Sequence, residues 1–193
     1  MSKDKNAFPK SQDFEKAIRQ YRAHRKKIRF LKAFICMLII ALAAGLYVNA
    51  SHFTLLQVEG NSMRKTLENG DVVLCHNTKE VQRGDIIAFN LDGVLLIKRV
   101  IGVEGDRISI MADGTVLLNG QRLDESYVYG KSLGNSDLVY PITVGAGEFF
   151  CMGDHRSTSI DSRTGSFGNV MKDSIVGTIE AVVWPFYRIG FSR

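Results

Sequence analysis

Lys98 is the residue whose type and position point most directly to chemistry. It lies inside the apolar run VLLIKRVIGV, next to a second cation, Arg99. Successive side chains of a strand point to opposite faces, so one of the two cations must share an apolar environment. Burial lowers the pKa of a lysine by up to about 3–5 units from about 10.4. Lys98 is therefore a candidate general base; the alternative is a buried stem with a solvated ammonium.

Ser62 is the candidate partner of this base. It follows Gly60 and Asn61 just after the β-prone run 54–58, so a turn of small residues presents a hydroxyl at a strand end. Most serines are ordinary surface or turn residues, and Ser62 alone would be a weak signal. A lysine amine can activate a serine without a histidine, and such a pair supplies a nucleophile and a base for acyl transfer.

A third polar segment, MGDHRSTSIDSR at 152–163, consists mostly of Ser, Thr, Asp and Arg. This composition is typical of a surface loop. Hydrogen bonds from its aspartates to the nearby backbone, together with an ion pair between Asp161 and Arg163, would make the loop rigid. A rigid polar loop can also orient a catalytic amine.

The part of the chain that must position these residues is predicted to be mostly β. Short β-branched and apolar runs are separated by Gly, Asp and Asn, without the strand and helix alternation of a parallel sheet. The pairs Asp113-Gly114 and Asn119-Gly120 predict tight hairpin turns. Residues 126–143 predict a loop-rich insertion. The expected fold class is mainly β and largely antiparallel, with strands near 71–74, 85–89, 94–103, 107–111, 115–118 and 174–183.

Positive charge is concentrated at the N-terminus. Residues 1–32 carry eleven of the 25 Lys and Arg residues but only three of the 20 Asp and Glu residues. The rest of the chain is mildly acidic and matches phosphate backbones poorly, so no nucleic-acid partner is expected. Residues 13–29 are rich in helix formers and predict a helix whose cations contact anionic lipid headgroups.

An uncharged stretch, 33–58, follows this basic segment, and its part 33–48 is solidly apolar. With its uncharged neighbours it reaches the length of about 20 residues that a spanning helix needs, so we expect a transmembrane anchor over 31–53. A cleaved signal peptide fits less well because the charged leader is long, and a core helix is rarely apolar on every face. The basic flank predicts a cytoplasmic segment 1–30 and an extracytoplasmic domain 54–193.

The cysteines and histidines suggest no further chemistry. Cys36 lies in the expected anchor, while Cys75 and Cys151 are either a disulfide or two small buried residues. The chain has no CxxC pair and its four histidines are scattered. Neither a metal site nor another cofactor is expected.

Five blocks together resemble the type I signal peptidase family of Ser/Lys proteases. Each block alone is a weak signal, but their order behind an N-terminal anchor is specific, and they extend over most of the chain. The blocks are EGNSMRKTL at 59–67, GDVV at 70–73, RGDII at 83–87, KRVIGVEGD at 98–106 and MGDHRSTSIDSR at 152–163.

The resemblance implies a β-rich catalytic domain at the outer face of the plasma membrane, with Ser62 as nucleophile and Lys98 as general base. It also implies that Ser159 hydrogen-bonds and orients the Lys98 amine. The Ser62 backbone N–H would help to stabilise the oxyanion, a task for which pre-placed donors are suited. The implied structural pairs are Asp154 with Arg99 and Asp161 with Arg163.

The implied substrates are exported preproteins whose signal peptides end in an Ala-x-Ala-like site. The substrate would bind as an extended strand beside the segments that lead into Ser62 and Lys98, with shallow pockets for small side chains. The expected binding residues are Gly60, Asn61, Met63 and Leu96. Two alternatives are a non-catalytic relative that assembles surface proteins such as pilins, and a self-cleaving repressor-type protease, which would work in the cytoplasm.

The match has three departures. Lys65 stands where the family usually has proline, which puts a flexible cation where a residue of restricted φ is expected. His155 stands where many members have Asn, a change we expect to be tolerated. Gly60 stands where some members place a serine that completes the oxyanion hole, so a second oxyanion donor would have to come from elsewhere.

Overall fold

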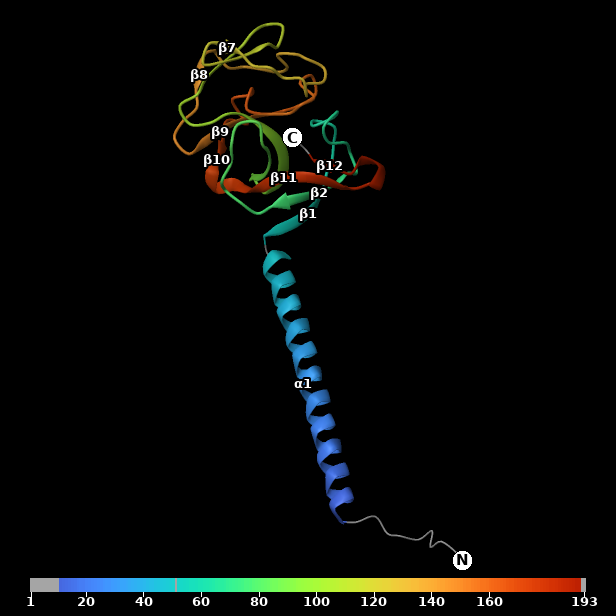
Figure 1. The fold of residues 1–193 in the computed structure, drawn as a ribbon. Coiled ribbons are helices and arrows are strands. Elements are labelled where there is room, and N and C mark those ends of the chain that lie inside the picture. The colour runs from blue at the N-terminus through green and yellow to red at the C-terminus, as the bar shows by residue number, and fades with distance from the viewer. Residues whose placement is uncertain (1–10, 51, 192–193) are drawn as a thin grey trace, which may run out of the picture. The chain divides into compact units, whose positions relative to one another are not determined.

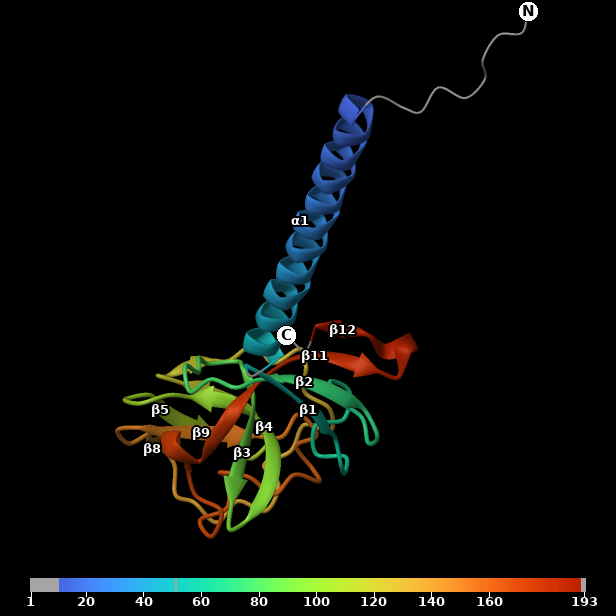
Figure 2. The same cartoon turned by 90° about the horizontal axis from the view of Figure 1, so that it is seen from below.

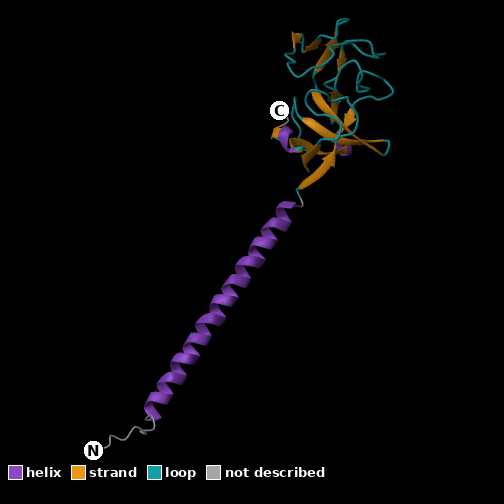
Figure 3. Ribbon diagram, turned by 90° about the vertical axis from the view of Figure 1, so that its right-hand side faces the viewer, coloured by secondary structure: helices purple, strands orange, loops and turns teal. Residues whose placement is uncertain are grey.

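The computed structural model describes residues 11–50 and 52–191 (Figure 1). The chain divides into two units, Met1–Asn49 and Ala50–Arg193. Figure 3 shows that helix dominates the first unit, whereas strands and loops make up nearly all of the second. The residues singled out for chemistry all lie in the second unit.

The described residues of the first unit belong to one helix, α1 (Ser11–Ala50), which includes the helix predicted over 13–29. Large apolar side chains between Phe30 and Leu42 are exposed along it. No helix in the described part of the chain is both long and apolar enough to cross a bilayer. The transmembrane anchor expected over 31–53 is therefore not confirmed.

The expected boundary of that anchor at residue 53 is wrong. Strand β1 (Phe53–Gln57) begins only a few residues after α1 ends, and Phe53 is its first residue. Phe53 pairs with His76 and Thr54 with Cys75 of the antiparallel strand β2 (Val72–His76). Hydropathy alone had assigned Phe53 to the anchor, but backbone pairing makes it part of a sheet.

The second unit contains a large antiparallel sheet, whose strands lie in the order β1-β2-β11-β3-β4-β9-β10, with β12 paired to β11. Figure 2 shows β3 and β4 side by side in this sheet. Beyond β1 and β2, its strands are β3 (Ile86–Leu91), β4 (Val94–Gly102), β9 (Glu148–Met152), β10 (Val170–Met171), β11 (Ile175–Trp184) and β12 (Gly190–Phe191). The 3₁₀ helices η1 (Lys172–Ser174) and η2 (Phe186–Arg188) flank β11. The prediction of a mainly antiparallel β domain is confirmed for this unit.

A smaller antiparallel sheet has the order β7-β6-β5-β8. Asn119 and Gly120 both have positive φ and join its strands β6 and β7, as expected for a two-residue hairpin turn. The turn at Asp113-Gly114 is longer than predicted, because Met111 pairs with Thr115 and only Gly114 has positive φ. The strands are β5 (Arg107–Ile110), β6 (Val116–Leu118), β7 (Gln121–Arg122) and β8 (Ile142–Thr143).

Three apolar clusters stabilise the two sheets. One lies under the β1–β2–β11 region, a second joins the small sheet to β4 and β9, and a third fills the space around β3 and β10. Cys75 belongs to the first cluster and Cys151 to the third, and both are free thiols that are fully buried. The disulfide alternative is therefore wrong, and these cysteines act as small apolar residues.

Candidate active site

Strand β4 places Lys98 and Arg99 on opposite faces of the large sheet. Lys98 pairs with Ile87 and Arg99 with Ile86 of β3, while β9 covers the other edge of β4 from Arg99 onward. The two cations are only 5% and 4% exposed. The sequence predicted that one of them is buried; the structure buries both, and their partners differ.

Ser62 lies in the turn that follows β1, and two buried side chains hold this turn in place. Met63 and Leu67 insert into the apolar cluster beneath β1 and β2. The amides of Thr66 and Leu67 both donate to the carbonyl of Met63, which closes one helical turn directly after Ser62. The half-buried Ser62 side chain is thus presented from a turn whose apolar positions anchor it in the core.

The two expected catalytic groups meet across 36 residues of sequence. Lys98 Nζ lies 2.7 Å from Ser62 Oγ and donates a hydrogen bond to it. Once the amine has lost its extra proton, the same pair can form the reverse hydrogen bond, with the hydroxyl donating to Nζ. The geometry required for proton transfer between these two groups is therefore present.

Burial sets the charge state of this amine. Loss of hydration is the largest effect and lowers the pKa of Lys98 below its ordinary value of 10.5. The charges of Asp161 and Asp154 oppose this effect, and the charge of Arg163 adds to it. No carboxylate within the described residues forms an ion pair with Lys98. The site therefore favours the neutral amine more than an exposed lysine would.

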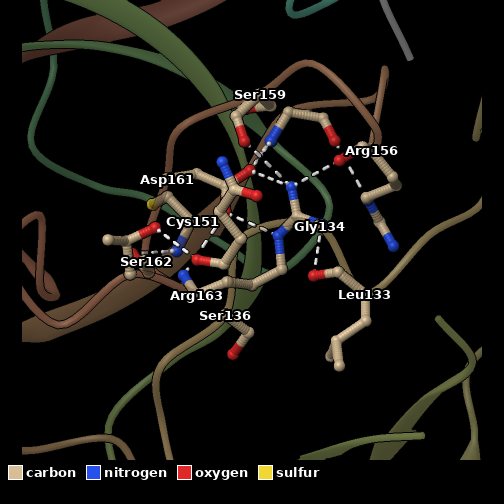
Figure 4. A network of polar contacts seen from close by, with 12 residues as sticks. Leu133, Gly134, Ser136, Cys151, Arg156, Ser159, Asp161, Ser162 and Arg163 are labelled. Atoms are coloured by element: carbon tan, nitrogen blue, oxygen red, sulfur yellow. Dashed lines mark hydrogen bonds and ion pairs between the residues drawn. The ribbon is translucent and has the colours of Figure 1, made fainter. Parts of the chain in front are cut away.

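The loop 152–163 is rigid and docks on the turn that carries Ser62. The His155 amide donates to the Ser62 carbonyl at 2.9 Å, and His155 Nδ1 lies 3.2 Å from the Asn61 carbonyl. The expected ion pair is formed, since Arg163 Nε donates to Asp161 Oδ1 at 2.7 Å (Figure 4). Arg163 also donates to the carbonyls of Ser132, Leu133, Arg156 and Ser159. One guanidinium thus links the loop 152–163 to the insertion 126–143.

Arg99 forms the second expected pair. Its Nε and Nη2 donate to the two carboxylate oxygens of Asp154 at 2.9 and 2.8 Å, and Nη1 donates to the Gly84 carbonyl. The guanidinium also stacks on the Tyr127 ring at 4.1 Å, and Thr66 donates to Asp154. A buried, fully hydrogen-bonded pair of this kind keeps the second cation away from Lys98.

Ser159 does not form the hydrogen bond to Lys98 that the resemblance implied. Its hydroxyl is buried and has no hydrogen-bond partner in the described part of the chain. Instead it packs against Gly153, where any Cβ would collide with both Ser159 Oγ and the Ser62 carbonyl oxygen. Gly153 therefore allows close contact between the loop and the nucleophile turn.

A groove of about 440 Å³ runs from Ser62 and Lys98 along two strands with free edges. One wall is the end of β1 and the other is the first half of β4. Among the described residues, β1 pairs with β2 alone, and β9 pairs with β4 from Arg99 onward. Gly60, Met63 and Leu96 line the groove as predicted for substrate contacts, whereas Asn61 is not among its lining residues. Two unpaired strand edges that flank a nucleophile can bind an extended peptide.

The departures at positions 60 and 155 have structural explanations. Gly60 has a φ of +86°, a conformation that a serine would adopt only with strain. The Gly60 amide donates to Asn69 Oδ1, which stabilises the turn before the nucleophile. His155 contacts the Asn61 carbonyl through its ring, so it contributes to docking of the loop.

Two features escaped the sequence analysis. Arg156 is fully buried and forms an ion pair with Glu125, the residue just before the insertion 126–143, a pairing across 31 residues that no local pattern indicates. Lys65 has a φ of +87° and donates from Nζ to the Ser126 carbonyl at 2.7 Å. The replacement of an expected proline marked position 65 as unusual, but neither its backbone conformation nor its partner was predictable.

The chain is similar in sequence to several known proteins. The family model described as signal peptidase, peptidase S26, matches residues 28–184. A signal peptidase I of Bacillus licheniformis is 34% identical over 79% of this chain and 88% of its own length, and signal peptidase I S of Bacillus subtilis strain 168 is 35% identical over 77% and 86%. A crystal structure of a signal peptidase I from Enterococcus faecalis V583 is 33% identical, covers 51% of this chain and 96% of that chain, and has a TM-score of 0.42.

A mainly antiparallel β unit with a buried lysine beside a serine defines a candidate serine hydrolase. The extent and identity of the matches go further: the chain belongs to the type I signal peptidase family, peptidase S26, and is a serine peptidase.

Proposed function

We propose that this chain removes N-terminal signal peptides from exported preproteins after Ala-x-Ala-like sites, with Ser62 as nucleophile and Lys98 as general base. The observation that carries the proposal is the 2.7 Å contact between Ser62 Oγ and a lysine amine that is 5% exposed. Burial of that amine, which lowers its pKa, supports its role as a base. The groove beside the pair supports a peptide substrate.

In the proposed mechanism, neutral Lys98 takes the Ser62 proton while Oγ attacks the scissile carbonyl carbon. The Ser62 backbone N–H stabilises the oxyanion of the tetrahedral intermediate. The Lys98 ammonium then protonates the leaving nitrogen, the C–N bond breaks, and an acyl-enzyme ester remains on Ser62. Lys98 next takes a proton from water, the resulting hydroxide attacks the ester, and the returned proton restores the Ser62 hydroxyl.

The groove supports a substrate bound as a strand between β1 and β4. Backbone hydrogen bonds to the two free strand edges would supply affinity without regard to side chains. Gly60 and the buried Met63 line one wall, and Leu96 contributes to the other. The preference for small residues at alternate substrate positions, as in Ala-x-Ala, is what the family resemblance implies for this groove.

We also propose that the N-terminal unit holds the enzyme at the plasma membrane, with the catalytic unit 54–193 extracytoplasmic and the segment 1–30 cytoplasmic. Lys26, Lys27 and Arg29 precede a run of exposed apolar side chains on α1, which supports contact with anionic lipid. Flotation of the full chain with phosphatidylglycerol-containing vesicles tests this part. Chain that stays unbound at low salt contradicts it.

Cleavage of a preprotein with an Ala-x-Ala site tests the catalytic proposal. Wild type should cut after the second Ala, whereas Ser62→Ala and Lys98→Ala should lose at least about 10³-fold in kcat/KM. Ser166→Ala and Lys79→Ala remove an exposed serine and an exposed lysine elsewhere and serve as matched controls. Wild type that binds the preprotein without cutting it would instead support a binding-only assembly factor. Full activity of Lys98→Ala would remove Lys98 from the mechanism.

A further inference from the structure

Arg64 and Lys65 lie two and three residues after the nucleophile, and both contact the same distant segment. Lys65 Nζ donates to the Ser126 carbonyl at 2.7 Å, across 61 residues of sequence. The Arg64 guanidinium lies over the Tyr129 ring, 5.6 Å from its centroid. Neither side chain is buried, and neither forms an ion pair in the described part of the chain. The two cations therefore join the Ser62 turn to residues 126–129.

Residues 126–129 are in turn connected back to Ser62. The Tyr129 amide donates to the Asp154 carbonyl at 2.8 Å, and the Arg156 amide donates to the Tyr129 carbonyl at 3.0 Å. The Tyr129 ring packs edge-on against the His155 ring at 4.8 Å. The His155 amide then donates to the Ser62 carbonyl. Residues 126–129 therefore contact the Ser62 turn in two ways: directly through Arg64 and Lys65, and indirectly through residues 154–156.

The backbone conformation of Lys65 indicates that these contacts constrain the turn that carries Ser62. A φ of +87° is uncommon for a residue with a long side chain and persists only where the surroundings enforce it. The apolar anchors Met63 and Leu67 hold the turn from below. The Lys65 hydrogen bond holds it from the solvent side, at the residue whose backbone is strained.

We propose that Lys65 is a positioning residue that fixes the Ser62 hydroxyl against the Lys98 amine by tying the nucleophile turn to residues 126–129, with Arg64 as a second tie. This inference rests on the proposed function for its effect on turnover, but the tie itself is a property of the folded chain. Displacement of a reacting group by about 1 Å can cost about 10²-fold in rate, so a single exposed hydrogen bond can affect turnover.

The first test measures the contact between Lys65 and residues 126–129 by amide hydrogen exchange and needs no activity assay. Amide hydrogen exchange is followed in wild type, Lys65→Met and Lys79→Met. Lys79 is a matched control because its Nζ also donates to a carbonyl, that of Asp173 at 3.1 Å, on an exposed surface. In Lys65→Met we expect the Tyr129 and His155 amides to exchange at least about fivefold faster, while Lys79→Met leaves them unchanged. Unchanged exchange in Lys65→Met would overturn the proposal.

The second test measures turnover of an Ala-x-Ala preprotein. Lys65→Met should lower kcat about tenfold with KM changed less than about twofold, and Lys65→Arg, which keeps a donor and a charge, should recover most of kcat. A loss in KM alone, or equal losses in Lys65→Met and Lys65→Arg, would contradict a positioning role. Assays are run well below each variant's unfolding midpoint, and Lys65→Gln replaces Lys65→Met if the latter does not fold.

Failure of the proposed function and failure of the Lys65 inference give different results in these tests. If wild type does not cleave the preprotein while exchange changes as expected, the proposed function fails and the tie stands. If wild type cleaves but Lys65→Met matches it in both exchange and kcat, the inference fails and the proposed function stands.

Discussion

The two faces of β4 give two adjacent buried cations, Lys98 and Arg99, different hydrogen-bond partners. Arg99 points to a face where Asp154 meets it with two hydrogen bonds and Tyr127 covers its plane. Lys98 points to the other face, where its described hydrogen-bond partner is a serine hydroxyl. The exposed fractions are nearly the same, so the difference between the two sites lies in the partners and not in the depth of burial.

This contrast shows how one strand can combine structure with chemistry. A buried guanidinium stays charged, so it needs a carboxylate and full hydrogen bonding to be tolerated. A buried amine without a carboxylate can instead lose its proton, which is the state a general base requires. Asp154 is held by Arg99 through two hydrogen bonds, so within the described residues it forms no ion pair with Lys98 and acts on that amine only through its charge.

Replacing the amine at position 98 by a guanidinium should give the largest effect, a loss of catalytic activity. Lys98→Arg keeps the positive charge but removes the base, because a guanidinium does not deprotonate in proteins. We expect kcat/KM for an Ala-x-Ala preprotein to fall about 10⁴-fold, equivalent to about 5.4 kcal/mol. The matched change on the other face, Arg99→Lys, keeps Lys98 intact and should lose far less. Comparable losses in the two variants would mean that both residues act only structurally.

Removing Arg99 from its ion pair with Asp154 should give the next largest effect, a loss of stability. Arg99→Met leaves the fully buried Asp154 carboxylate without its cation, and we expect the free energy of unfolding to fall by about 3–5 kcal/mol. Urea denaturation of the catalytic unit within the full chain measures this loss. The double variant Arg99→Met/Asp154→Leu removes both charges and should recover most of it. A double variant as unstable as Arg99→Met would mean that the pair itself, and not the unpaired carboxylate, determines the loss.

The sequence predicted that Lys98 and Arg99 lie on opposite faces of a strand, but it could not show which face carries Asp154. Strand alternation predicted that Lys98 and Arg99 point in opposite directions, and the local Asp161 to Arg163 pair followed from their spacing. Alternation cannot say which face holds Asp154, because that residue lies 55 positions further along the chain. Only the resemblance to a family implied that pairing, and the structure confirms that Arg99 binds Asp154.

Other features depended on contacts that no local pattern encodes. The pairing of Phe53 with His76 places this residue in a sheet and not in the expected anchor, and hydropathy does not reveal a strand partner. Ser159 was expected to hydrogen-bond the Lys98 amine, but within the described residues its hydroxyl has no hydrogen-bond partner and packs against Gly153. The positive φ of Lys65 likewise follows from tertiary contacts rather than from the residue type.

The smallest expected effect concerns the stability cost of keeping Lys98 buried. The pKa of Lys98 is lowered from 10.5 in the folded chain, so the unfolded chain binds the proton more tightly. The unfolding free energy therefore rises with pH between the lowered pKa and about 10.5, as this penalty disappears. Lys98→Met removes the penalty, and we expect its Tm to exceed that of wild type at neutral pH, by about 2–4 °C for each kcal/mol gained.

The pH dependence of that difference distinguishes desolvation from a simple packing change. The Tm advantage of Lys98→Met should shrink as the pH approaches 10.5, because groups that titrate in both proteins cancel in the difference. Ser62→Ala serves as the control, since it removes the hydroxyl but keeps the amine and should retain the wild-type pH slope. A constant advantage at every pH would mean that methionine only packs better. A Tm below that of wild type at neutral pH would mean that the Ser62 hydrogen bond outweighs the lost hydration, and that Lys98 is stabilised in the same way as Arg99.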